Sequence, residues 1–352
     1  MSTLLMAAAV SLVLFVSIVE VGLRLADPDL SYTSSSFPVN RDINFSEVYE
    51  MDTQLFWRFR RATLIDSRRY SGLSYQVNSL RMRGKEISTL TDDYRIVAIG
   101  NSCTFGWGIP QQYTWVDLLE TILNIRKPEN RVQVLNAGVP GYTSYQGWQY
   151  FKRDLLDLDP NMVLIMFGWN DHWPAGKRIE DARQKMPGRV LVSVHNLLSR
   201  LKLYQLLRKA ASSAVGEPVT ESLGDLADDH SSPRRVALDE FVKNLEAMIA
   251  LARENDAKPV LMIPPVASPQ IYYEGRPWNL HYLHEPYQGC IRSVASQHSV
   301  PVIDLQAAFD RSANLFDRHQ TDPIHFNVKG HRLVAAAAAD VVSPLISETS
   351  AQ

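Results

Sequence analysis

The sequence has 352 residues, of which 45% are hydrophobic and 21% charged, with a formal net charge of -2. This is the composition of an ordinary folded protein, long enough for one large α/β domain with an appendage or for two smaller domains. The nearly neutral charge provides no basic field, so we expect no nucleic-acid partner. Two cysteines form neither a disulfide framework nor a metal set, and without a phosphate loop or dinucleotide fingerprint we expect no cofactor.

The chain begins with an apolar segment. Residues 4–19 are apolar except for two serines, and the apolar character resumes after Glu20 as far as Ala26. At about 1.5 Å per residue, the whole segment reaches the roughly 30 Å of a bilayer core. Glu20 and Arg24 can pair on one helix face near the interface.

We interpret residues 1–26 as an uncleaved, single-pass transmembrane anchor. No basic residue precedes the apolar run and no convincing small-x-small cleavage site follows it, which disfavours the alternative of a cleavable signal peptide. A buried core helix is a further alternative at this position. The positive-inside rule determines the orientation poorly and, if anything, would hold the C-terminal side inside.

Two segments separate this anchor from the main domain. Residues 27–45 are rich in Ser, Asp and Pro, as is typical of a linker. Alternating stretches between residues 48 and 90, such as Leu73–Val77, predict a short antiparallel element. We group residues 27–92 as a linker and accessory segment, followed by the main domain over residues 93–345.

The main domain alternates short apolar strands with helices. The predicted strands are Arg95–Ile99, Val132–Leu135, Met162–Phe167, Pro259–Ile263 and Val300–Leu305. The predicted helices are Thr114–Ile125, Ser144–Leu156, Val236–Asn255, Tyr282–Gln297 and Gly330–Leu345. This alternation is typical of a parallel sheet covered on both faces, in which ligands bind at the carboxyl ends of the strands.

A helical and polar insertion at residues 172–235 interrupts the alternation. Its sequence predicts one basic, amphipathic helix around Val194–Ala211, followed by a polar run from Gly216 to Pro233. A structureless connection of this length is usually a lid, a binding loop or disorder. We expect it to cover the active site, with a solvated surface insertion as the alternative.

Four polar segments lie in the main domain, and we expect each at the end of a strand. The first runs from a buried-looking strand into Gly100-Asn101-Ser102, which places a serine on a strand-to-helix turn. Asn136-Ala137-Gly138 follows the next strand, and residues 168–171 follow the third. Asp322-Pro323-Ile324-His325 is near the C-terminus. Together these segments contain every part of a serine hydrolase.

Ser102 needs a base, because an unassisted serine hydroxyl is a poor nucleophile. His325 is the candidate base, since Asp322 lies three residues before it on the same loop. A turn containing Pro323 can bring the carboxylate to the imidazole Nδ1 atom while Nε2 faces Ser102. A surface salt bridge is the alternative for the Asp322–His325 pair.

A tetrahedral oxyanion also needs hydrogen-bond donors. The backbone N–H groups of Ser102 and Gly138 and the side-chain amide of Asn170 can converge on it. Gly138 lacks a Cβ atom, so its backbone can approach a substrate closely. In isolation, the segment at Gly138 would be an ordinary turn and Asn170-Asp171 an ordinary helix cap.

In order and spacing, the four segments resemble the blocks of the SGNH (GDSL-type) hydrolases. That family consists of esterases and acyl hydrolases on a flavodoxin-like, three-layer α/β/α sandwich, here implied to contain a five-stranded parallel sheet. The four residues that name the family would be Ser102, Gly138, Asn170 and His325. The resemblance covers roughly residues 93–345, and the anchor together with Gly-Trp-Gly at 106–108 resembles the bacterial envelope members.

One position departs from the family pattern. Asn101 occupies the place of the acid in the usual Gly-Asp-Ser. In the family that acid is not the nucleophile, the base or the partner of the base. Asn101 has the same shape without the charge, so we expect it to alter local hydrogen bonding more than the mechanism.

The resemblance implies a membrane-anchored serine esterase or acyl hydrolase with an extracytoplasmic catalytic domain. Its partners would be the membrane, through the N-terminal helix, and an ester substrate, for which the resemblance suggests an acylated envelope or exopolysaccharide glycan. Two alternatives remain open. One is a polysaccharide O-acyltransferase that uses the same triad, and the other is a non-catalytic polymer-binding module.

The residues next to these segments have two interpretations. The aromatic side chains Trp107, Trp169, Trp173 and His172 can line a rim for sugars or acyl chains, or pack in the interior. Cys103 is expected to be a buried small residue rather than a reactive thiol.

Overall fold

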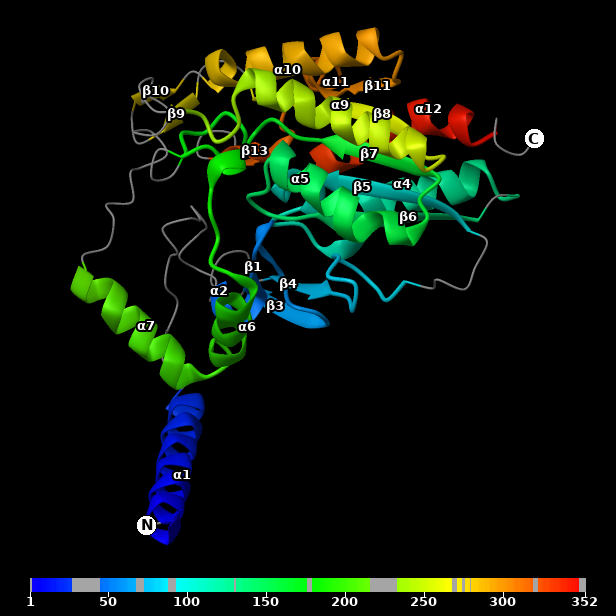
Figure 1. Ribbon diagram of the computed structural model, residues 1–352. Helices are drawn as coiled ribbons and strands as arrows, with labels where there is room; N and C mark the ends of the chain where they lie inside the picture. Colours follow the sequence, from blue (N-terminus) through cyan, green and yellow to red (C-terminus); the bar gives the residue numbers. More distant parts are fainter. Residues whose placement is uncertain are drawn as a thin grey trace. The chain divides into compact units, whose positions relative to one another are not determined.

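The chain divides into two units, residues 1–60 with 186–220 and residues 61–185 with 221–352 (Figure 1). This computed structural model describes most of the sequence, namely residues 2–26, 45–67, 73–87, 93–129, 131–175, 179–215, 233–267, 271–273, 276–278, 280–318 and 322–347. The predicted linker lies outside the described residues apart from Phe45. The predicted polar run does so apart from Pro233.

The larger unit contains a five-stranded parallel sheet in the order β11-β8-β7-β5-β6. Its strands are β5 (Tyr94–Gly100), β6 (Val132–Gly138), β7 (Met162–Met166), β8 (Lys258–Ile263) and β11 (Val302–Asp304). The first strand along the chain lies between the second and third, as in flavodoxin-like sheets. The predicted five-stranded parallel sheet is confirmed. β6 runs further than predicted, so Asn136-Ala137-Gly138 ends the strand instead of following it.

Helices cover this sheet on both faces. The long ones are α4 (Trp115–Arg126), α9 (Leu238–Glu254), α10 (Leu280–Gln297) and α12 (Val328–Ser347). The predicted helix Ser144–Leu156 is in fact α5 (Ser144–Tyr150), continued by a π turn (Phe151–Leu155) and a 3₁₀ turn (Leu156–Leu158). The short helices are α3 (Ser102–Phe105), α11 (Leu305–Phe309) and the 3₁₀ turns Gln111–Tyr113 and Asp181–Arg183.

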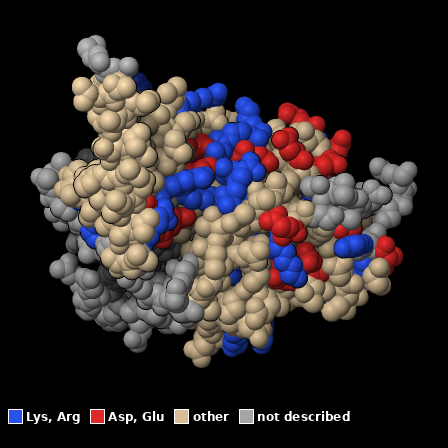
Figure 2. Space-filling model, turned by 90° about the horizontal axis from the view of Figure 1, so that it is seen from below, with Lys and Arg blue, Asp and Glu red and all other residues tan. Residues whose placement is uncertain are grey.

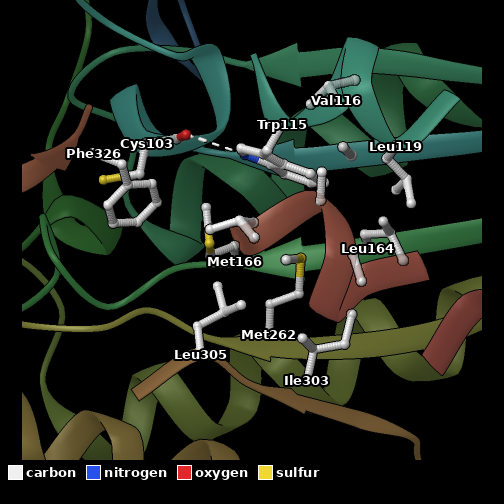
Figure 3. Packing of buried hydrophobic residues seen from close by; sticks show 14 of the residues in the cluster. Cys103, Trp115, Val116, Leu119, Leu164, Met166, Met262, Ile303, Leu305 and Phe326 are labelled. Carbon is white, nitrogen blue, oxygen red and sulfur yellow. Dashed lines mark hydrogen bonds between the residues drawn. The ribbon is translucent and has the colours of Figure 1, made fainter. Parts of the chain in front are cut away.

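The burial of alternate strand residues shows the three layers. Successive side chains of a strand point to opposite faces of a sheet. Ile96, Leu164 and Met262 pack in one cluster with α4 and α12, and Figure 3 shows several of its members between the sheet and these helices. Their neighbours Val97 and Ile165 point to the other face and are equally buried. α5, α9 and α10 contact the strands there.

Three short antiparallel pairs complete the larger unit. They are β3 (Thr63–Ser67) with β4 (Leu73–Val77), β9 (Ile271–Tyr273) with β10 (Arg276–Trp278), and β12 (Phe316–Arg318) with β13 (Asp322–Phe326). The first pair confirms the antiparallel element predicted before the main domain. The last pair corrects a prediction, because the segment from Asp322 to His325 is not a loop at the end of a parallel strand but part of β13.

The smaller unit contains the apolar N-terminal helix. Its elements are α1 (Ser2–Ala26), α2 (Phe45–Val48), the antiparallel strands β1 (Tyr49–Asp52) and β2 (Phe56–Phe59), α6 (Arg189–Leu198) and α7 (Lys202–Val215). By length and composition α1 can cross a membrane, a test that a signal sequence also passes. The predicted pairing of Glu20 with Arg24 is confirmed at 2.7 Å.

The prediction of a single helix around residues 194–211 was wrong. Residues 194–211 do not form one helix but the end of α6 and most of α7, with a break at Ser199–Leu201. Ser199 is buried there, and its Oγ atom accepts a hydrogen bond from Arg60 Nη2 at 2.8 Å. Its carbonyl oxygen accepts another hydrogen bond from Gln205 Nε2 at 2.8 Å. These two side-chain hydrogen bonds stabilise Ser199 at the break between the helices.

Charges of both signs mix on the face of the protein that Figure 2 shows. Lys and Arg side chains lie there beside Asp and Glu side chains. This arrangement agrees with the small net charge of the chain.

Two helical glycines of the larger unit allow a matched stability test. A Cβ atom at Gly147 in α5 would overlap the buried ring of Phe167, whereas a Cβ at Gly289 in α10 would meet nothing within 4 Å. We expect Gly147→Ala to lower the free energy of unfolding by about 1–3 kcal/mol through overpacking. Gly289→Ala should raise it by up to about 1 kcal/mol through helix propensity. Urea denaturation of both variants checks this, and equal effects would contradict the packing described for α5.

Candidate active site

Ser102, His325 and Asp322 form one chain of hydrogen bonds in the larger unit. His325 Nε2 lies 2.8 Å from Ser102 Oγ, and His325 Nδ1 lies 2.7 Å from Asp322 Oδ2. Ser102 is the first residue of α3, directly after β5, while His325 and Asp322 come from β13. The side chains of His325 and Asp322 are 21% and 19% exposed, so solvent and small molecules can reach the pair.

Asp322 is held as an oriented carboxylate. Its Oδ1 atom accepts hydrogen bonds from the backbone N–H groups of Ile324 at 3.2 Å and His325 at 3.0 Å. Burial acts to raise the pKa of Asp322, but the imidazole of His325 and these amides outweigh it, so the pKa lies below its ordinary value. An ionised Asp322 accepts a hydrogen bond from the N–H of His325 Nδ1, and this tautomer leaves Nε2 as an acceptor facing Ser102.

The turn that carries Ser102 depends on close packing between Gly100 and Thr104. A Cβ atom at Gly100 would overlap Thr104 Oγ1, so the residue at the end of β5 has to be glycine. Asn101 is the N-cap of α3, and its Oδ1 atom accepts a hydrogen bond from the N–H of Cys103 at 3.0 Å. In this structure Asn101 therefore acts on local hydrogen bonding.

The sequence analysis missed Arg83, which holds the other end of α3. Its guanidinium donates to the carbonyl oxygens of Phe105 at 2.7 Å and Gly106 at 2.6 Å, and also to that of Ile109. It lies 4.6 Å from the centre of the Tyr75 ring. Burial lowers the pKa of Arg83 to about 10, so the side chain is still a cation at neutral pH. A single arginine outside any motif gives no sequence signal of such a contact.

Two of the three proposed oxyanion donors are Gly138, at the end of β6, and Asn170, in the turn after β7. One N–H of the Asn170 side-chain amide donates to the carbonyl oxygen of Tyr142 at 2.9 Å, which orients the amide and leaves it a second N–H. The Gly138 N–H donates to Asn136 Oδ1 at 3.1 Å, so a substrate oxygen would have to share or replace that bond. A Cβ atom at Gly138 would overlap the backbone of Phe105, so this glycine also allows β6 to pack against α3.

Asp171 ties these two strand ends together. It is fully buried and accepts hydrogen bonds from the N–H groups of Ser144 at 2.8 Å and Gly168 at 3.0 Å. Burial raises the pKa of Asp171 to about 6, against the opposing effects of these bonds and of Arg235. Gly168 has a φ of +132°, a conformation that favours glycine. The sequence analysis considered Asp171 only as part of a helix cap.

The structure decides between the two interpretations of the neighbouring aromatic residues. The side chains concerned are buried, namely those of Trp107, Trp169, Trp173 and His172. Trp169 stacks on His284 with ring centres 4.2 Å apart. The interpretation as a binding rim was therefore wrong, because these rings pack in the interior.

The prediction for Cys103 is confirmed. Cys103 is 2% exposed, and burial raises the pKa of its thiol. Figure 3 shows its backbone carbonyl accepting the indole N–H of Trp115, at 3.2 Å. Within the described ranges, no group of three or more His, Cys, Asp or Glu side chains is placed to hold a metal ion.

Comparison with known proteins identifies the family. The profile of the GDSL-like Lipase/Acylhydrolase family matches residues 98–333. The chain belongs to this family. It is a serine hydrolase that acts on ester bonds, and all five residues of the proposed triad and oxyanion hole lie within the matched segment.

Several solved structures are similar in fold. The lipase/acylhydrolase from Enterococcus faecalis is 22% identical, with a TM-score of 0.46 over 71% of this chain and 96% of that chain. The acetylxylan esterase Axe2 from Geobacillus stearothermophilus is 17% identical, with a TM-score of 0.46 over 72% and 96%. Likenesses of this size concern the fold alone.

A curated relative matches a shorter part of the chain. The uncharacterized lipoprotein YqeF of Bacillus subtilis (strain 168) is 36% identical over 81 residues. The match covers 22% of this chain and 31% of the relative, so the chain spans about a third of that protein's length.

The contacts of Arg83 lead to a prediction about activity. Arg83→Met removes the donors to the last carbonyls of α3, so we expect kcat to fall by about 10- to 100-fold through displacement of Ser102, while KM stays nearly unchanged. Loss of these bonds should also lower the free energy of unfolding by on the order of 3 kcal/mol. Ester hydrolysis measured well below the unfolding temperature checks this.

The matched control is Arg126→Met, which removes a half-exposed arginine paired with Asp340 at 2.9 Å. It should leave both kcat and stability close to those of the wild type. If Arg83→Met lost stability and kept its full kcat, Arg83 would support only the framework.

Proposed function

We propose that this chain is a serine esterase in which Ser102 is the nucleophile, His325 the general base and Asp322 the residue that orients the base. The observation that carries the proposal is the unbroken contact from Asp322 through His325 to Ser102, with distances of 2.7 Å and 2.8 Å. Both are within the reach that proton transfer requires. Membership of the esterase family supports the same chemistry.

The proposed reaction passes through an acyl-enzyme. Ser102 Oγ attacks the ester carbonyl carbon while His325 Nε2 accepts the hydroxyl proton, and Asp322 stabilises the imidazolium. As the tetrahedral intermediate collapses, the bond to the leaving alcohol breaks and His325 returns the proton to its oxygen. Water then attacks the acyl group by the same two steps, which releases the carboxylic acid and restores Ser102.

The oxyanion of each intermediate would be bound by three donors. They are the N–H groups of Ser102 and Gly138 and the free N–H of the Asn170 amide. The N–H of Ser102 is the first amide of α3, and the first amides of a helix have no acceptor within it. The fixed bond from Asn170 to Tyr142 supports a preorganised role for its amide.

We infer that α1 stays in the protein as a membrane anchor. Glu20 of α1 accepts hydrogen bonds from the N–H groups of Lys202 and Leu203 at the start of α7, both at 3.0 Å. Cleavage after α1 would leave those amides without their acceptor. This contact favours the anchor over the cleavable signal peptide.

For the substrate, we propose a small acyl group esterified to a glycan of the cell envelope. The anchor and the resemblance to bacterial envelope esterases support this class, with the catalytic domain on the extracytoplasmic side. If a sugar hydroxyl took the place of water in the second half of the reaction, the same triad would perform acyl transfer.

The first test concerns the nucleophile and its base. Ser102→Ala should abolish both ester hydrolysis and labelling by a fluorophosphonate, whereas the exposed Ser312→Ala should keep both. His325→Ala should lower kcat by several orders of magnitude, and Asp322→Asn somewhat less. Because the residues act as one unit, the double variant should resemble the single His325→Ala. Full labelling of Ser102→Ala, or strictly additive losses, would overturn the assignment.

The second test concerns the oxyanion hole. Asn170→Ala should lower kcat by about 10²–10³-fold with little change in KM, because the lost donor acts only on transition-state charge. Asn170→Asp should be worse, since it puts an anion beside the developing oxyanion. Kinetics on a soluble ester, with the fold checked by circular dichroism, decide the matter. A raised KM at unchanged kcat would place Asn170 in substrate binding instead.

The substrate class is tested with two sets of esters. Hydrolysis of p-nitrophenyl esters should fall from acetate to octanoate, and an O-acetylated polysaccharide should release acetate in the presence of the enzyme. Preference for long chains would exclude the small acyl group. Acetate transfer from the chromogenic ester to a de-acetylated polysaccharide, in competition with hydrolysis, would identify an acyltransferase. Absence of any turnover would favour a binding module.

A further inference from the structure

The start of α7 is fixed to the end of α1 in the smaller unit. Besides its bonds to the amides of Lys202 and Leu203, Glu20 pairs with Arg24 at 2.7 Å, and Arg24 Nη2 donates to the carbonyl oxygen of Arg200 at 2.9 Å. Glu20 and Arg24 are the first charged residues after the apolar run of α1. The break between α6 and α7 is therefore held where α1 would leave the hydrocarbon core of a bilayer.

α6 packs Val192 and Asn196 against the protein and leaves an apolar stripe on the outside. On the inner face, Asn196 forms two hydrogen bonds of 2.8 Å with the backbone of Met51 in β1. On the opposite face, Val190, Val194 and Leu197 have the i, i+4, i+7 spacing of one stripe. Their exposed fractions are 76%, 48% and 69%. A surface helix in water normally turns such an apolar stripe toward the core.

α7 also exposes apolar side chains, and the segment carries positive charge. Leu206 and Leu207 are exposed by 39% and 60%. Residues 186–215, which include both helices, contain five Lys or Arg residues and no Asp or Glu. Exposed apolar side chains next to basic ones are typical of helices that bind an anionic membrane surface.

We propose that α6 and α7 form a membrane-surface element that binds the anionic lipid headgroups of the bilayer that α1 enters. The apolar side chains flanking the break, Leu197 and Leu207, insert between the headgroups, while basic side chains of the two helices contact the lipid phosphates. The element lies next to the anchor, so it needs no further targeting signal. The inference depends on α1 as an anchor and is independent of the catalytic assignments.

The test uses the full chain, carrying Cys290→Ser, in liposomes. An environment-sensitive NBD fluorophore is attached at Leu197→Cys or Leu207→Cys, with Ile125→Cys on α4 as a control that is 74% exposed. Vesicles of phosphatidylcholine and phosphatidylglycerol contain a lipid with a nitroxide near the top of the acyl chain, because interfacial helices lie about 5–10 Å deep. Ester hydrolysis by each labelled protein reports that it is folded.

We expect blue-shifted emission and about a twofold loss of fluorescence at both helix positions, and neither effect at Ile125→Cys. The loss should be smaller in pure phosphatidylcholine. Adding Leu197→Glu should also reduce the quenching at Leu207→Cys, because the proposal places both side chains between the headgroups of the same bilayer.

Three results would overturn the proposal. Emission and quenching at the helix positions equal to those of the control would show that the helices do not touch lipid. Equal quenching with and without phosphatidylglycerol would exclude recognition of anionic headgroups. A blue shift without quenching by the nitroxide, accompanied by self-quenching that grows with the labelled fraction, would assign the surface to contact with a second copy of the chain.

Discussion

The close backbone packing of α3 against the ends of β5 and β6 is the constraint on which the active site depends. Gly100 and Gly138 are paired in register at these two strand ends, and a Cβ atom at either would overlap α3. Because neither strand end carries a side chain, the backbone of α3 can pack directly against the two strands. Ser102, the first residue of α3, is only half-buried in this position. Asn101 and Arg83 then bind the two ends of the short helix.

Two aspartates near this turn show how burial and hydrogen bonding give the same type of side chain different properties. Asp322 has an imidazole partner and a pKa below its ordinary value, so its charge is available to orient His325. Asp171 is fully buried, and its pKa is raised to about 6. Its two acceptor bonds join the start of α5, which follows β6, to the turn after β7 that carries Asn170. The first carboxylate is hydrogen-bonded to an imidazole that faces Ser102, and the second holds backbone groups in place.

The sequence predicted those parts that depend on local pattern. Apolar runs predicted all five parallel strands. Motif spacing pointed to Ser102, Asp322 and His325, which the structure brings into contact. The errors arose where contacts distant in sequence decide the structure. Arg83 acts on carbonyls more than twenty residues away, and the break at Ser199 depends on Arg60. The aromatic residues around Trp169 were ambiguous, because a tryptophan beside an active-site block has the same sequence whether it lines a rim or fills the core.

The structure explains how an acidic residue, Glu20, is accommodated within the N-terminal apolar segment. An ionised carboxylate next to lipid is unfavourable unless charges or donors satisfy its oxygens. Glu20 has Arg24 one turn away and two backbone donors from α7, 182 and 183 residues further along the chain. The same contact satisfies the first amides of α7, which no carbonyl of that helix can reach. Glu20 therefore joins α1 to α7, and replacing it would leave both Arg24 and the first amides of α7 without this partner.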